Sequence, residues 1–322
     1  MFEIKIRSYN PTFDGMWDDF VKRSRNGTFL HTRRFLGYHA DRFDDCSLVI
    51  ELEGKIIGVF PAHCNGDMVM SHNGLTFGGL VVGMDQRYAL VQEMIVSICR
   101  HFAALGMNRL LYKPVPKVFQ RYPSEDDLFA IHHIGGRLVR RDLTAVVPAS
   151  GPWKVSKLRK RGRAKALKHG VEIKSGNFFE EFHILLSANL KKHGAKPVHN
   201  LRELIDLGDR CSDQLELLGA FEDDELVAAS WLFHFDTAIH TQYLTSSSRG
   251  RAMGALDHLL LHVLDLAHER QVAVSFGASS ENRGTVVNEG LMAQKEGFGA
   301  RAQVLDHYEI NLNVSELDHA FE

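Results

Sequence analysis

The chain has 322 residues, of which 44% are hydrophobic and 24% charged, and its formal net charge is -2. This length suits two domains of ordinary size, and the near-neutral charge argues against a dedicated nucleic-acid binder, which usually carries a basic excess. No segment approaches the roughly 18 apolar residues that a membrane span requires. Residues 1–10 alternate apolar and charged side chains, which is not typical of a signal or transit peptide. The four cysteines are scattered without Cys-x-x-Cys spacing, so we expect neither a disulfide framework nor structural zinc, and a reducing cytoplasm fits.

The first half of the chain is predicted to alternate strands and helices. The expected strands are 2–8, the two arms of a hairpin within 47–64, 68–82, 108–114 and 137–148. The expected helices are 15–24, 30–41, a long one that ends at Gly106, and 124–134. The hairpin turns at Glu53-Gly54, a strong two-residue turn signal. The long helix carries apolar residues at i, i+3 and i+4 from Val91 to Phe102, and a glycine is expected just after its end.

The second half repeats this order of elements. The expected strands are 171–175, a hairpin within 215–235, 238–245, 272–278 and 297–312, and the expected helices are 178–192, 200–208, 256–267 and 286–296. The hairpin turns at Gly54 and Asp224 lie 170 residues apart, and Gly136 and Gly299 lie 163 apart. Two independent landmarks therefore agree on one offset within the length of a loop, which indicates a duplicated domain.

A strongly basic stretch separates the two halves. Residues 153–170 contain eight Lys or Arg and no acidic residue, and we place the domain boundary here. The predicted organisation is an N-terminal domain at 1–150, a basic linker helix at 151–170 and a C-terminal domain at 171–322. The fold class is α/β (α+β), with two tandem domains that each hold a mixed, largely antiparallel sheet flanked by helices. The linker is interpreted as a solvated segment packed on a domain, and its alternative role is contact with a nucleotide diphosphate.

The loop before the central helix of the second half carries a recognisable pattern. It consists of Ser248, Arg249, Gly250, Arg251, Ala252, Met253 and Gly254. Small residues let backbone N–H groups approach a phosphate, and arginines add positive charge. With the order of elements, this loop resembles the GNAT acyltransferase superfamily, whose pattern Gln/Arg-x-x-Gly-x-Gly/Ala binds the coenzyme A pyrophosphate, although Ala252 replaces one glycine. An ordinary strand-to-helix turn is the alternative.

The equivalent turn of the first half, Gly83 to Arg87, offers one small residue. Asp85 lies where a helix N-cap is expected, and its carboxylate would repel a pyrophosphate. Coenzyme binding is therefore assigned to the second half only, and the first half is interpreted as a wall of the acceptor site.

Further motifs resemble the FemAB-like, tandem-GNAT branch. They are Phe276-Gly277-Ala278-Ser279, Asn288-Glu289-Gly290-Leu291, Lys295-Glu296-Gly297-Phe298-Gly299-Ala300, Ser71 to Gly79, Asn26 to His31, and Tyr38-His39. This branch includes aminoacyl transferases of peptidoglycan and N-acyltransferases of nucleotide-linked amino sugars. The resemblance implies acyl-CoA as co-substrate, no metal, and transfer of an acetyl or 3-hydroxybutyryl group to a dTDP-linked amino-dideoxyhexose for surface polysaccharide.

One departure concerns the catalytic acid. Many GNAT enzymes carry a tyrosine four residues before the Gly-Phe pair, where this chain has Ala293. The candidate catalytic residues are His72, His240 and Glu281, and the candidate substrate-binding residues are His31, Asn73, Lys113, Tyr243, Asn282 and Asn288. His240 and Tyr243 are an odd number of residues apart on a strand, so only one can face a cleft. Glu281 in a polar run is equally typical of a solvated loop, Asn288 of a helix start, and Lys295 of the polar face of a helix.

Two other functions stay open at this point. A Fem-type transferase would use aminoacyl-tRNA and a peptidoglycan precursor, and the basic linker would then contact RNA. A non-catalytic acyl-CoA-binding protein is the third possibility, because a fold does not determine a function and the usual tyrosine is missing. The histidines at 258 and 262, four residues apart, lack the glutamate of a zinc protease motif, so we expect no metal.

Overall fold

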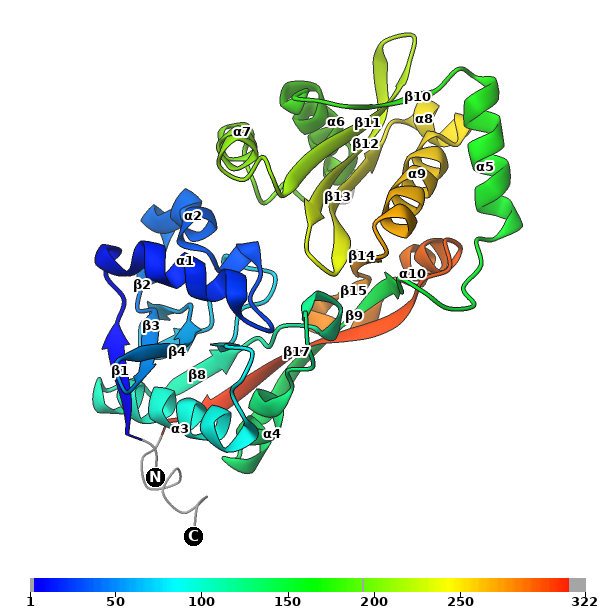
Figure 1. Ribbon diagram of the computed structural model, residues 1–322. Coiled ribbons are helices and arrows are strands. Elements are labelled where there is room, and N and C mark those ends of the chain that lie inside the picture. Colours follow the sequence, from blue (N-terminus) through cyan, green and yellow to red (C-terminus); the bar gives the residue numbers. More distant parts are fainter. Residues whose placement is uncertain (1–2, 193, 313–322) are drawn as a thin grey trace. The chain divides into compact units, whose positions relative to one another are not determined.

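The computed structural model describes residues 3–192 and 194–312. The described residues divide into two compact units, the first formed by residues 3–142 with 304–312 and the second by residues 143–192 with 194–303. Each unit is a mixed sheet structure flanked by helices, so the predicted fold class is confirmed (Figure 1). The division differs from the expected one, because the C-terminal strand enters the first unit and the basic stretch is part of the second. Among the described residues, no helix is both long and apolar enough to cross a membrane.

The first unit contains two sheets. One follows the order β1 (Ile4–Ser8), β3 (Leu48–Leu52), β4 (Lys55–Phe60) and β7 (Val81–Val82). The other follows the order β9 (Arg137–Val147), β17 (Arg301–Asn311), β8 (Arg109–Tyr112), β6 (Met68–Met70), β5 (His63–Asn65) and β2 (Asp44–Asp45). The expected β stretch at 68–82 is wrong as one strand, because residues 71–80 between β6 and β7 are irregular.

Helices cover the sheets of the first unit. They are α1 (Asp14–Arg23), α2 (Arg33–Leu36), α3 (Tyr88–Ala104) and α4 (Asp126–His133). The predicted apolar face of α3 from Val91 to Phe102 is buried in the core of the unit. The expected helical stretch at 30–41 is present but divided into three pieces, α2 and the 3-10 helices Phe29–His31 and Gly37–Arg42 on its two sides.

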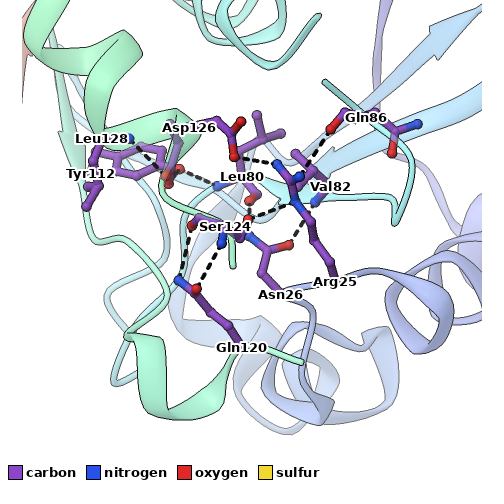
Figure 2. A network of polar contacts seen from close by, with 11 residues as sticks. Arg25, Asn26, Leu80, Val82, Gln86, Tyr112, Gln120, Ser124, Asp126 and Leu128 are labelled. Atoms are coloured by element: carbon purple, nitrogen blue, oxygen red, sulfur yellow. Dashed lines mark hydrogen bonds and ion pairs between the residues drawn. The ribbon is translucent and has the colours of Figure 1, made fainter. Parts of the chain in front are cut away.

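A network of polar side chains in the first unit binds backbone groups at Leu80 and Val82, at the start of β7 (Figure 2). The Asn26 amide donates to the Leu80 carbonyl at 2.9 Å and accepts from the Val82 N–H at 2.9 Å. The Tyr112 hydroxyl accepts from the Leu80 N–H at 2.8 Å. Nearby, the buried Arg25 guanidinium donates to Asp126 and to a backbone carbonyl. Backbone groups that lack a neighbouring strand are therefore satisfied by side chains.

The second unit contains a large sheet and a short two-stranded sheet of β15 (Ser280–Glu281) and β16 (Val286–Val287). The strands of the large sheet are β10 (Glu172–Ser175), β11 (Leu215–Glu222), β12 (Glu225–His234), β13 (Ala238–Ser246), β14 (Ala273–Ala278) and the C-terminal part of β9. The hairpin between β11 and β12 turns at Asp223-Asp224, as predicted, and both residues have positive φ, 48° and 63°. Positive φ at both central residues is what a tight hairpin turn of the right twist needs.

The helices of the second unit are α5 (Lys157–Lys168), α6 (Phe179–Lys191), α7 (Leu201–Arg210), α8 (Ser248–Met253), α9 (Ala255–Glu269) and α10 (Glu289–Glu296). The predicted apolar face of α9 forms the centre of the core. Helix α5, the expected linker, packs along α9 (Figure 1). Its Arg159 pairs with Asp257 at 2.8 Å and its Arg163 with Asp265 at 2.7 Å.

Candidate functional site

The second unit has a cavity where two parallel strands diverge. Strands β13 and β14 are paired only from Ala238 to His240, although β13 continues to Ser246. A cavity of about 990 Å³ opens beyond the paired segment, and both strands contribute to its wall through Leu244 and Phe276. Its size is in the range of small-molecule and cofactor sites. The unpaired edge of β13 leaves backbone groups available to a ligand in this cavity.

The cavity wall combines positive charge with apolar surface. The cationic side chains that line it are Arg159, Lys192, Arg251 and Lys295. The apolar ones are Leu244, Leu256, Leu260, Phe276, Leu291 and Phe298. Two carboxylates, Asp257 and Glu281, also line it, and the first of these is paired with Arg159. Such a wall suits a ligand that has both phosphate groups and an apolar chain.

Lys295 is a buried cation in this wall. Its ammonium donates to the carbonyls of Gly277 and Ala278 at 3.0 and 2.8 Å and to the Ser279 hydroxyl at 2.8 Å. These three acceptors match its three N–H donors. Burial lowers the pKa of Lys295 to about 8, so the group is still mostly charged at neutral pH. The lysine thereby holds the end of β14 in place and adds positive charge beside the cavity.

Two predicted residues, Glu281 and Asn288, contact each other in the wall of the same cavity. The Asn288 amide donates to the Glu281 carboxylate at 2.8 Å, and both side chains line the cavity. Asn288 also caps α10, because its side-chain oxygen accepts from the Leu291 N–H at 3.0 Å. Asn282 follows Glu281 in an exposed turn with a φ of 49°. The helix-start interpretation of Asn288 and its position in the cavity are therefore compatible.

The predicted phosphate loop is largely helical. Residues 248–253 form α8. The N–H groups of Gly250 and Arg251 donate to Ser247 at its N-cap, and the N–H of Gly254 at its C-cap donates to the Arg251 carbonyl. Arg251 and Gly254 line the cavity. Arg249 instead pairs with Glu222 and Glu225 of the β11–β12 hairpin, at 2.6 and 2.9 Å.

The remaining loop residues serve packing and local bonds. The Ser248 hydroxyl accepts from Arg251 at 3.2 Å, and the Ala252 carbonyl accepts from Lys165 at 2.6 Å. Met253 belongs to the core. A Cβ atom at Gly250 would lie 2.1 Å from the Val227 carbonyl oxygen. The loop therefore presents one of its two arginines, Arg251, to the cavity, whereas Arg249 is held by the β11–β12 hairpin.

His240 and Tyr243 lie away from this cavity. His240 is buried and its Nδ1 is 3.1 Å from the Ser275 hydroxyl. Burial, with the charge of Lys295 as a smaller cause, lowers the pKa of His240 to about 4. The Tyr243 hydroxyl is 2.8 Å from Nδ1 of His199. Tyr243 packs against Phe182 of α6, on the face of the sheet that α6 covers.

Four predicted residues belong to the first unit. His72 has a φ of 63° and its ring stacks on His39 at 5.0 Å and meets His63 at 5.3 Å. Burial, with the neighbouring histidines, lowers the pKa of His72 to about 2. Asn73 is exposed, and its N–H donates to Nδ1 of His63 at 3.3 Å. Lys113 is buried, donates to the Leu75 carbonyl at 2.7 Å, and has its pKa lowered by burial to about 7.

His31 is part of the framework of the first unit. Its Nδ1 accepts from the Thr28 N–H at 3.0 Å, which caps a helical turn, and its Nε2 is 3.2 Å from the Gly78 carbonyl. This pattern requires a neutral ring, with the proton on Nε2. Burial lowers the pKa of His31 to about 4, against its ordinary value of 6.5.

The stability of the first unit is therefore expected to fall as pH drops from about 6.5 towards 4. In this window the unfolded chain binds a proton at His31 that the folded protein does not, so the free energy of unfolding decreases with falling pH. The contribution of His31 is at most roughly 3 kcal/mol. Urea unfolding at several pH values measures the slope, and a His31→Gln variant should show a shallower one. An equal slope in both proteins would contradict the assignment.

Comparison with known proteins adds evidence on the fold. No protein-family model matches the sequence, and no curated protein matches it either. Among solved structures, FemX is similar over 98% of this chain and 99% of its own, at 12% identity and a TM-score of 0.68. L-PGS from Bacillus licheniformis is similar over 98% of this chain and 97% of its own, at 13% identity and a TM-score of 0.62.

A third structure is a tandem GNAT protein from the clavulanic acid biosynthesis pathway. It matches 97% of this chain and 99% of its own, at 8% identity and a TM-score of 0.53. This chain has the fold of tandem GNAT acyltransferases. The structural similarity covers both units of this chain. At such low sequence identities it is evidence for the fold alone. Within residues 3–192 and 194–312, no group of three or more His, Cys, Asp or Glu side chains is arranged to hold a metal ion.

Of the residues that line the cavity, the sequence identified Arg251, Gly254, Glu281 and Asn288 as candidates, and two of the cations that it did not identify are instructive. Lys295 was interpreted as part of a polar helix face, yet it is 4% exposed. The available signal was its spacing, because it follows the buried Met292 by three residues and so shares its face of α10. Arg159 is one of eight Lys or Arg residues in the basic stretch 153–170, and nothing in the sequence distinguishes it from the others. The packing of α5 on α9 places it in the cavity wall.

Proposed function

We propose that the protein is an N-acyltransferase that binds acyl-CoA in the cavity of the second unit and transfers the acyl group to the amine of a nucleotide-linked amino sugar. The observation that carries the proposal is the cavity itself, which opens between diverging parallel strands and has a wall of four cations and six apolar side chains. The cations suit the phosphates of coenzyme A, and the apolar surface suits its pantetheine and acyl chain. The acceptor class is supported by the sequence motifs at 26–31 and 71–79.

The proposed reaction joins the amine nitrogen to the thioester carbonyl carbon. The C–N bond forms, the C–S bond breaks, and the sulfur leaves as the coenzyme A thiol after taking up a proton. Alignment of the two substrates supplies much of the acceleration in such a reaction. The Glu281 carboxylate, oriented by Asn288, is the group of the cavity wall that suits removal of a proton from the attacking ammonium. The charge of Lys295 favours the negative charge that develops on the carbonyl oxygen.

A direct assay tests the activity. The protein is incubated with acetyl-CoA or 3-hydroxybutyryl-CoA and a panel of dTDP- and UDP-linked amino sugars, and thiol release is followed. We expect release that depends on both substrates. Binding of coenzyme A without turnover of any amine would support the non-catalytic alternative. Transfer from aminoacyl-tRNA in the absence of coenzyme A binding would support the Fem-type alternative.

The two arginines of the loop offer a matched pair of variants. Arg251→Ala removes a charge that lines the cavity, and we expect coenzyme A affinity to fall about 10- to 100-fold, the effect of one hydrogen bond to a charged group. Arg249→Ala removes a charge that is paired with Glu222 and Glu225, and we expect little change in affinity. Titration calorimetry with coenzyme A measures both. A larger loss for Arg249→Ala than for Arg251→Ala would contradict the proposed position of the phosphates.

A further inference from the structure

Helix α5 has an outer face that carries unpaired positive charge. We define the α5 outer face as Lys157, Lys160, Arg161 and Lys168, which are all exposed. The opposite side of the helix packs on α9 through Arg159, Arg163 and the buried Ala166. Within the part of the chain that the structure describes, none of the four outer cations forms an ion pair. The packing of α5 on α9 thus determines which charges point to solvent.

Two leucines flank this charged face. Leu158 is 58% exposed and Leu167 is 55% exposed. At 100° per residue, Lys157, Arg161 and Lys168 lie along the middle of the outer surface, and the two leucines lie on its two sides. The outer half of α5 is therefore a basic stripe with an apolar side chain at each edge.

The stripe places four positive charges on one side of a helix in a chain that is close to neutral overall. The whole chain has a formal net charge of -2, so attraction to an anionic partner arises at α5 and not from the overall charge. Lys157 and Arg161 are four residues apart on the helix, and like charges at this spacing destabilise a helix. A partner that neutralises them would remove this repulsion.

We propose that the α5 outer face is a docking surface for an anionic lipid layer. Lysine and arginine side chains are attracted to the headgroup phosphates of such a surface, and the apolar side chains of an interfacial helix lie at the boundary with the acyl chains. A headgroup layer is broad enough to cover Leu158, Leu167 and the cations between them. A nucleic acid backbone also neutralises the cations, but its phosphates leave the two leucines in water, so the leucines favour a lipid surface.

Cosedimentation of the full chain with vesicles tests the proposal. We expect binding to vesicles that contain phosphatidylglycerol, no binding to pure phosphatidylcholine, and weaker binding as the salt concentration rises. Each cation near an anionic surface contributes about fivefold to the affinity, so replacing all four outer cations with glutamine should abolish measurable binding. A matched control replaces four exposed lysines elsewhere, Lys5, Lys22, Lys55 and Lys191, and should retain most of it.

A second pair of variants separates a lipid surface from other polyanions. Leu158→Gln with Leu167→Gln should weaken vesicle binding severalfold and leave the binding of single-stranded RNA unchanged. Thermal unfolding checks the folded state, and removal of the like charges should not lower the melting temperature. The proposal is overturned when the wild-type chain does not bind phosphatidylglycerol vesicles at low salt, when it binds RNA but not vesicles, or when the control variant loses as much binding as the α5 variant. The acyltransferase assay uses soluble substrates, so its outcome is independent of this one.

Discussion

Replacing Lys295 with methionine is expected to lower acyl transfer at least about 100-fold, the usual effect of removing one group that stabilises developing charge in the transition state. The substitution keeps much of the side-chain volume but removes the only positive charge that is buried in the cavity wall among the described residues. It also leaves the carbonyls of Gly277 and Ala278 without their donor. We therefore expect a loss of stability in the second unit of about 1–3 kcal/mol.

The pH profile distinguishes an electrostatic role of Lys295 from a structural one. Because the pKa of this lysine is lowered to about 8, activity that depends on its charge should decline as pH rises through that value. The residual activity of Lys295→Met should lack this decline. Lys191→Met, on the exposed end of α6, is the control and should match the wild type. If the variant were merely less stable and its residual activity kept the same alkaline decline, Lys295 would be a structural residue only.

The order of elements was predictable from the sequence because it depends on local patterns. Both hairpin turns were found, at Glu53-Gly54 and at Asp223-Asp224, since tight turns need residues that accept positive φ. The long helices α3 and α9 were found because their apolar residues repeat at the helical period. Duplication was inferred from the similar spacing of such landmarks, 170 and 163 residues.

Contacts between distant segments were not predictable in this way. The stretch 68–82 has the composition of a strand, but Asn26 and Tyr112, far away in the chain, bond to its backbone at Leu80 and so replace a neighbouring strand. The C-terminal strand β17 alternates like the others, and no local signal says that it joins β8 of the first unit. A pattern of alternation predicts a strand but not its partner.

The contacts within the candidate site were likewise not predictable from local sequence patterns. The loop at 248–254 matched a phosphate-binding pattern, but the pattern does not say whether its N–H groups are free or bonded within a helix. Burial of Lys295 depends on acceptors 16 to 18 residues earlier in the chain. Glu281 and Asn288 were identified as candidates, and only the structure shows that they contact each other. The chemical role of a single residue could be inferred from the sequence, whereas the contacts between these residues depend on the fold.

Replacing Gly254, at the end of the loop 248–254, with alanine is expected to reduce the stability of the second unit. Gly254 has a φ of 81°, and a Cβ atom there would lie 2.4 Å from the backbone oxygen of Gly162 in α5. The conformation alone costs an alanine about 1–2 kcal/mol, and the contact would force α5 away from α9. We expect Gly254→Ala to destabilise the second unit by about 3 kcal/mol or more in urea unfolding.

Gly290 provides the matched control for this prediction. It also lines the cavity, but it lies in the first turn of α10, and the nearest atom to an added Cβ is the Asn288 side-chain oxygen at 3.8 Å. Gly290→Ala should therefore leave stability unchanged or raise it slightly. If Gly254 served only to admit a phosphate group, its alanine variant would instead retain wild-type stability and bind coenzyme A more weakly. Unfolding and coenzyme A titration of the two variants therefore decide whether the glycine at the end of this loop is required by the packing of α5 on α9 or by a ligand.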